Sequence, residues 1–157
     1  MPKLLSLKTG VLLLTIVLAG GWAFRQAQQR VTVAQGERLF HGEALLAGRI
    51  VGHTMVLPVT VSRCMNCHEA RSTAVSAAAS AVAGGQAGRY GPTLDHETLG
   101  QLRTRRGGPP SRYDAAALCT LLRTGVDPAQ VMIPQTMPHY DIADADCAAL
   151  WAYLLSR

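Results

Sequence analysis

A long apolar run opens the chain, and shorter stretches with helical or strand-like spacing follow it. Residues 11–24 (VLLLTIVLAGGWAF) are almost entirely apolar, and Lys3 and Lys8 precede them. A basic start followed by a short apolar centre is typical of a secretory signal. We therefore expect the chain to be exported, with residues 1–24 as a signal peptide or a membrane anchor.

The end of this run bears on whether the segment is removed. The small residues 19–21 offer a cleavage site, whereas Trp22 and Phe24 are typical of an anchor at a membrane interface. The run alone is short for a hydrocarbon core of about 30 Å, but a helix that starts at Leu4, with Lys8 reaching toward water, spans it. We expect an anchor that holds the rest of the chain on the periplasmic side of the inner membrane. The alternative is a soluble periplasmic protein after cleavage.

Polar residues separate this segment from the remainder of the chain. Residues 25–31 predict a short linker, and residues 32–157 then form a single domain. Gly36 and Phe40 are spaced to share one face of a first helix that starts near residue 32. A glycine inside a helix costs about 1 kcal/mol relative to Ala, so Gly36 indicates the close approach of another backbone.

Two later segments have no regular apolar period and predict insertions into the domain. Residues 45–62 mix β-branched residues with Gly and Pro, which predicts extended loops or a small hairpin. Residues 70–89 are mostly Ala, Ser and Gly, the composition of either an Ala-rich helix or a flexible surface insertion. We assign no function to the second segment.

Helical spacing returns in the C-terminal part. Residues 113–124 predict a helix with Asp114 as its N-cap and Gly125 as its stop. A last helix is expected over residues 144–155, where aspartates in the first turn favour the helix dipole.

The sequence Cys64-Met65-Asn66-Cys67-His68 is the strongest chemical signal in the chain. Two thiols three residues apart reach both vinyl groups of one porphyrin, and the next side chain presents an imidazole to the iron. A dithiol redox pair would need a strand leading into the motif, and a zinc site would need two further ligands at suitable spacing. Neither pattern is present, so we expect one covalently attached haem c.

Composition agrees with a small domain around such a group. The 157 residues, 48% of them hydrophobic, suffice for one small domain with an appendage. Only 5% are aromatic, so a buried porphyrin would supply much of the missing apolar core. The net charge of +5 raises the question of nucleic acid, but the arginines are scattered and no nucleic-acid motif accompanies them. We expect no nucleic-acid partner.

With His68 on one side of the iron, the other side either takes a second side chain or stays open for a ligand. Met137 is the favoured candidate because Pro138 and neighbouring turn formers would hold its thioether on a rigid loop. Met132, beside Ile133, is better explained as a core residue. The other candidates are His41, His53, Met55, His96 and His139.

Two further cysteines, Cys119 and Cys147, lie on the last two predicted helices. An even pair left over after haem attachment in an exported protein favours a disulfide. The alternative is two buried free thiols.

Several elements together resemble a class I c-type cytochrome. They are Gly36 and Phe40, the motif at 64–68, the turn Gly91-Pro92-Thr93-Leu94, the segment Met137-Pro138-His139-Tyr140, and the helix with Leu150 and Tyr153. The resemblance implies an all-α cytochrome c fold, with helices packed around one covalent haem. Its first and last helices would cross, so that Gly36 and Phe40 meet Leu150 and Tyr153.

The resemblance also implies roles at the site. The carbonyl of Pro92 would accept the Nδ1 proton of His68, and Met137 would be the distal ligand, so that His68 and Met137 bind the metal. The segments 45–62 and 70–89 are longer than in compact members of the family, so the resemblance does not extend to the edges of the haem or to its local partners.

A haem iron with His and Met ligands stays low-spin in both oxidation states, which suits the transfer of single electrons. We expect the protein to carry electrons between exocytoplasmic redox partners and not to be an enzyme itself. The alternatives are a cytochrome subunit of a larger respiratory or dehydrogenase complex and, less favoured, a haem enzyme or gas sensor with an open distal position. Arg103, Arg105 and Arg106, with Arg112, form a candidate docking surface for an acidic redox partner, or simply a solvated basic loop.

Overall fold

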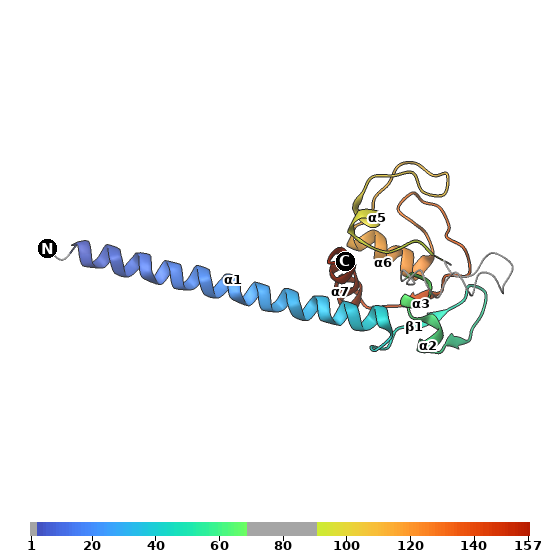
Figure 1. The fold of residues 1–157 in the computed structure, drawn as a ribbon, viewed down its shortest axis with the longest axis horizontal. Coiled ribbons are helices and arrows are strands. Elements are labelled where there is room, and N and C mark those ends of the chain that lie inside the picture. Colours follow the sequence, from blue (N-terminus) through green and yellow to red (C-terminus); the bar gives the residue numbers. More distant parts are fainter. Residues whose placement is uncertain (1–2, 69–90) are drawn as a thin grey trace, which may run out of the picture.

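A computed structural model describes the backbone of residues 3–68 and 91–157, and their side chains from residue 17 onward. Helix α1 (Lys3–His41) projects far from a domain that contains the other described elements (Figure 1). Among the described residues, no helix is both long and apolar enough to cross a membrane. The predicted insertion at residues 70–89 lies outside the described residues.

The predicted helix start near residue 32 is wrong, because α1 passes through residues 25–31 without a break. Residues 25–30 are Arg, Gln and Ala, which are strong helix formers, and neither Gly nor Pro interrupts the segment up to Val31. The segment expected to be a linker is therefore helical and continuous with the first helix of the domain.

The C-terminal end of α1 crosses α7 (Asp144–Leu155), as the resemblance implied. A Cβ on Gly36 would overlap the carbonyl oxygen of Ala149, so only a glycine allows the two backbones to come this close. Phe40 is fully buried beside them, with its ring centroid 5.5 Å from that of Tyr153. The predicted close approach at Gly36 is confirmed.

Local signals set the ends of the shorter helices. Helix α6 (Ala115–Thr124) begins where Asp114 accepts a hydrogen bond from the Ala117 N–H at 2.8 Å. It ends at Gly125, whose φ of 71° is the left-handed conformation of a helix C-cap. Helix α5 (His96–Gly100) has Asp95 as its N-cap. The predicted boundaries of the last two helices are confirmed.

The expectation of an all-α fold is corrected by a small antiparallel sheet. Strands β1 (Ala47–Arg49) and β2 (Val56–Leu57) form the small hairpin that the sequence indicated. Strand β3 (His139–Asp141) then pairs with the other edge of β1, in the order β2-β1-β3. The sheet joins segments about 90 positions apart in the sequence, a distance over which short-range patterns carry no information.

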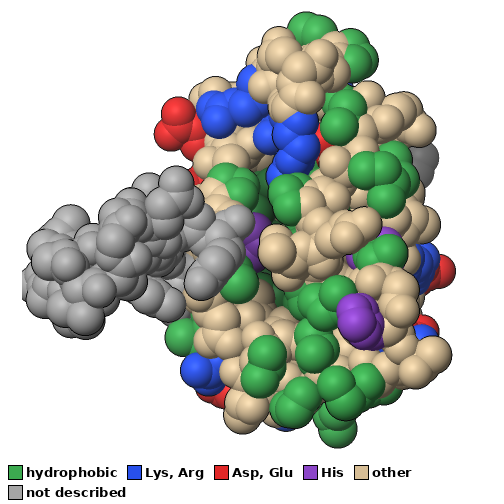
Figure 2. All heavy atoms as spheres, turned by 90° about the vertical axis from the view of Figure 1, so that its right-hand side faces the viewer, with side chains coloured by type: hydrophobic (Ala, Val, Ile, Leu, Met, Phe, Trp, Pro, Cys, Tyr) green, Lys and Arg blue, Asp and Glu red, His purple; other side chains and the backbone are tan. Residues whose placement is uncertain are grey.

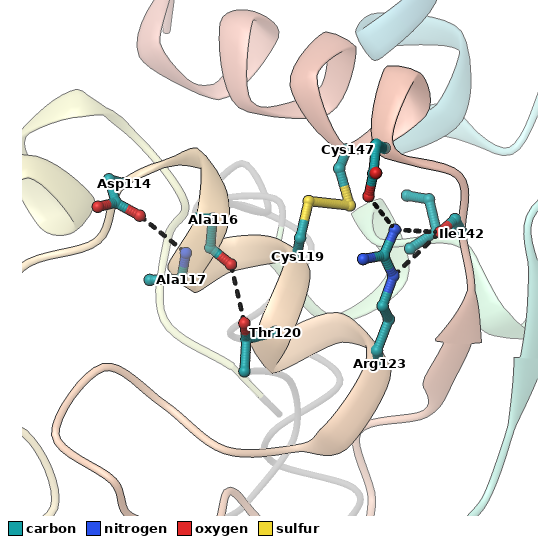
Figure 3. The surroundings of a disulfide bond; sticks show 9 residues. Asp114, Ala116, Ala117, Cys119, Thr120, Arg123, Ile142 and Cys147 are labelled. Carbon is teal, nitrogen blue, oxygen red and sulfur yellow. Dashed lines mark hydrogen bonds and ion pairs between the residues drawn. A yellow bond between two sulfur atoms is a disulfide. The ribbon is translucent and has the colours of Figure 1, made fainter.

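Helices α6 and α7 are joined by the disulfide between Cys119 and Cys147 (Figure 3). Their Cα atoms are 5.6 Å apart, within the usual range for such a bond. Arg123 of α6 reinforces the junction, since its guanidinium donates to the Ile142 carbonyl at 2.7 Å and to Asp144 at 2.6 Å (Figure 3). The disulfide and Arg123 together connect α6 to α7 and to the residues just before α7.

Candidate haem site

Short segments on one side of the helix crossing enclose a cavity of about 610 Å³. This volume is in the range of sites for small organic ligands and cofactors. Apolar side chains from several elements form most of its wall, including Phe40, Leu57, Leu99, Leu121 and Leu150. On the face opposite the projecting helix, hydrophobic side chains gather over the lower part, and a group of basic side chains lies in the upper part (Figure 2).

The two thiols come from a tight turn that contains helix α3 (Met65–His68). The Cys64 carbonyl accepts hydrogen bonds from the N–H groups of Cys67 and His68, at 3.1 and 2.9 Å, which closes the turn. Both cysteines line the cavity, and neither forms a disulfide. The motif thus presents two free sulfur atoms to one apolar space.

Residues just before the motif fix this turn. Helix α2 (Val59–Ser62) leads into it, and the Asn66 amide donates to the Thr60 carbonyl at 2.8 Å. Arg63 Nε donates to Asn66 Oδ1 at 2.8 Å. Burial raises the pKa of the Cys64 thiol to about 12, so this cysteine is a neutral thiol before any reaction.

The imidazole of His68 lines the same cavity and is oriented by Pro92, which also lines it. Its Nδ1 lies 2.8 Å from the carbonyl oxygen of Pro92. Since a carbonyl oxygen only accepts, Nδ1 carries the proton and Nε2 keeps its lone pair for a metal ion. Burial lowers the pKa of His68, against the opposing effect of the Pro92 carbonyl, which favours the neutral ring that metal binding needs.

Among the sulfur atoms considered as a second ligand, the structure brings only Met137 to the cavity wall. The Met137 N–H donates to the Pro134 carbonyl at 3.0 Å, which forms a turn on the loop before β3. Met132 and Met55 are 58% and 70% exposed and do not line the cavity, so the expectation that Met132 is a core residue is wrong. The loop therefore offers one thioether to the site.

None of the histidine candidates other than His68 lines the cavity. His41 makes contacts elsewhere, with Nδ1 3.3 Å from Met65 Sδ and Nε2 3.2 Å from the Tyr153 hydroxyl. His139 lies against Gly125, and His53 and His96 are exposed.

The structure differs from the expected docking role of Arg105. Its guanidinium donates to the Thr98 carbonyl at 2.9 Å and lies 4.8 Å from the centre of the Tyr113 ring. Arg105 lines the cavity, and its Nε is buried without a hydrogen-bond partner. Because burial dominates, the pKa of this guanidinium is lowered. Nothing in the local sequence distinguished Arg105 from its neighbours.

The other arginines of this loop have different surroundings. Arg106 lines the cavity and forms an ion pair of 3.4 Å with the buried Asp127, while 38% of its side chain stays exposed. Arg103 donates to the Gln101 side chain at 2.8 Å, and Arg112 is exposed. The four arginines therefore do not form one outward-facing surface.

Two thiols, an imidazole with a free nitrogen and a thioether around one apolar cavity define the site of a covalently bound haem. A family model described as cytochrome c matches residues 57–157, and the chain belongs to this family. It therefore carries one covalently bound haem c, and electron transfer is the activity of the family. No curated protein and no solved structure matches the chain.

Proposed function

We propose that the chain is a monohaem electron carrier whose haem iron is bound by His68 and Met137. One observation supports this most directly: the imidazole and the Met137 thioether line the same cavity as both motif thiols, whereas Met55 and Met132 do not. An electron carrier needs two redox partner proteins, one that donates the electron and one that accepts it.

Haem, when bound, supplies an iron that alternates between the ferric and ferrous states by gaining and losing one electron. Cys64 and Cys67 would hold the haem through two thioether bonds, each formed by addition of an S–H group across one vinyl group, which needs neither a leaving group nor an oxidant. The Pro92 carbonyl holds the Nδ1 proton of His68 and so fixes the ring orientation. The apolar wall excludes water, and a thioether ligand favours the reduced state.

The unpartnered Arg105 Nε supports the fit of a haem. A buried guanidinium N–H without an acceptor is costly, and the propionate groups of a haem are acceptors of the required charge. Arg105 thus belongs to the cofactor site in this proposal. Arg103, Arg106 and Arg112 remain the candidates for contact with an acidic partner.

For location, we propose an anchor in the inner membrane formed by residues 1–24, with the haem domain on the periplasmic side. The described end of this segment has exposed apolar side chains, with Leu18 at 63%, Trp22 at 67% and Phe24 at 65%. Such a helix surface fits lipid better than water. A subunit role in a larger membrane complex is compatible with the same anchor.

Replacing Met137 by Ala tests the ligand assignment. In the haem-loaded ferric protein, the substitution should abolish the weak far-red band that a thioether on the iron produces, and it should lower the midpoint potential. Met132→Ala is the matched control and should change neither. Loss of the band in Met132→Ala, with the band retained in Met137→Ala, would exclude the assignment.

A further inference from the structure

The hairpin of β1 and β2 packs on the loop that carries Met137. Strand β1 lies outside residues 57–157, the part that matches the family, whereas β3 lies inside it. In the β1–β3 pairing, Arg49 is opposite His139 and Gly48 is opposite Tyr140. Strand β3 thus begins two residues after Met137 and is hydrogen-bonded to an element that the family match does not include.

Gly48 packs closely against residues next to both haem-binding segments. A Cβ there would lie 3.0 Å from Ser62 Cβ, 3.1 Å from Tyr140 Cε1 and 3.3 Å from Pro138 Cβ. Pro138 directly follows Met137, and Ser62 is two residues before Cys64. A side chain at position 48 would therefore crowd both haem-binding segments at once.

A buried hydrogen bond ties the same two segments together. The Tyr140 hydroxyl donates to the Ser62 carbonyl at 2.5 Å, and both residues are buried. Burial raises the pKa of Tyr140 above its ordinary value, so the hydroxyl stays a donor. This bond connects the strand after Met137 to the helix before the thiol motif.

We propose that the hairpin is a clamp that keeps the Met137 loop closed on the haem, with Gly48 as its positioning residue. The proposal rests on Met137 being a ligand. A loop of turn formers has no internal ladder to hold it, so its position depends on what packs against it. Without the clamp, the fraction of molecules with Met137 away from the iron rises.

That open fraction can be measured with imidazole as the probe. Imidazole binds the ferric iron only when Met137 has left, so its apparent dissociation constant is the intrinsic constant divided by the open fraction. Gly48→Val should fit the strand locally, because Val favours β structure, but it collides with Pro138 and Ser62. We expect the apparent constant for imidazole to fall by on the order of tenfold.

Three controls separate positioning from general destabilisation. Arg49→Val alters the same strand at an exposed position, and its imidazole affinity should stay unchanged. Leu39→Ala weakens the α1 packing at a position that does not line the cavity, so it should lower the denaturation midpoint without changing imidazole affinity. Tyr140→Phe removes only the hydrogen bond to Ser62 and should also strengthen imidazole binding. If Gly48→Val does not fold, Tyr140→Phe still tests the clamp in a folded protein.

The outcomes distinguish this proposal from the ligand assignment. If Met137→Ala abolishes the far-red band while Gly48→Val and Tyr140→Phe bind imidazole like the unmodified protein, the ligand is right and the clamp is refuted. If Leu39→Ala strengthens imidazole binding as much as Gly48→Val and Tyr140→Phe do, the effect comes from general destabilisation of the fold, and the clamp is also refuted. If Met137→Ala leaves the band intact, the proposed ligand itself is wrong.

Discussion

Replacing Gly36 by Ala tests the helix crossing on which the haem domain is built. The added Cβ would overlap the Ala149 carbonyl oxygen, and it would lie 2.6 Å from the Ala149 carbonyl carbon and 2.7 Å from Tyr153 Cβ. Backbone atoms have no alternative rotamer, so the overlap is relieved only when α1 and α7 move apart. The close-packed interior transmits that shift to the neighbouring side chains.

Two effects of opposite sign determine the magnitude. Ala is favoured over Gly inside a helix by about 1 kcal/mol. Overpacking a dense interface costs about 1–3 kcal/mol, and this interface includes Leu39 and Phe40, which are 1% and 0% exposed. Since the added Cβ collides with the main chain, the overpacking cost should be at or above about 3 kcal/mol, the upper end of that range. We expect Gly36→Ala to lose at least about 2 kcal/mol of unfolding free energy.

Denaturant unfolding of the haem-loaded protein measures this loss as a lower midpoint at unchanged slope. Gly21→Ala is the matched control, because Gly21 is in the same helix and a Cβ there would meet nothing within 4 Å. It should cause no loss. A Gly36→Ala variant as stable as the unmodified protein, or more stable, would refute a backbone approach of α1 to α7 at this position.

Two further predictions concern stability. The disulfide between Cys119 and Cys147 spans 28 positions. The chain-entropy model therefore predicts that replacing both cysteines by Ala lowers the unfolding free energy by about 3.5 kcal/mol. A loss under about 1 kcal/mol in denaturant unfolding would contradict that model for this protein. The pKa of Asp95 is lowered because its carboxylate accepts a hydrogen bond from the Thr98 N–H. The ionised carboxylate therefore stabilises the folded protein at pH values above the unfolded pKa of Asp95. This stabilisation is lost as the pH falls through the folded pKa. Stability should therefore fall more between about pH 5 and about pH 2 in the unmodified protein than in Asp95→Asn, and equal falls would count against the cap.

The sequence predicted elements whose signals are local. Asp114 and Gly125 bracket α6 because a side-chain cap and a left-handed glycine act within one helical turn. The polar residues 25–30 interrupt the apolar pattern and so suggest a linker, but their helix propensity is high, and α1 continues through them. Strand β3 was missed because three residues show no period, and its partner is distant in the sequence.

At the site, the motif alone predicted the thiols and His68, since their spacing is set by the porphyrin. Pro92 was expected only from the family resemblance, whereas Met137 was expected also from the turn formers around it, and the structure places both on the cavity wall. The inward position of Arg105 was not predictable, because four arginines with similar neighbours differ only in tertiary contacts. Which of them turns inward depends on the position of Tyr113 and of the α5 carbonyl groups.

The helix crossing and the proposed haem ligands belong to different elements, and this separation explains why a clamp is needed. Helices α1 and α7 contribute apolar wall to the cavity, through Phe40 and Leu150, but no proposed ligand. The ligands lie on a four-residue helix and a turn, and segments this short do not hold their own geometry. Loss of packing at the crossing should thus lower the unfolding midpoint with the iron ligands unchanged, whereas loss of packing at Gly48 should release a ligand from a domain that remains folded.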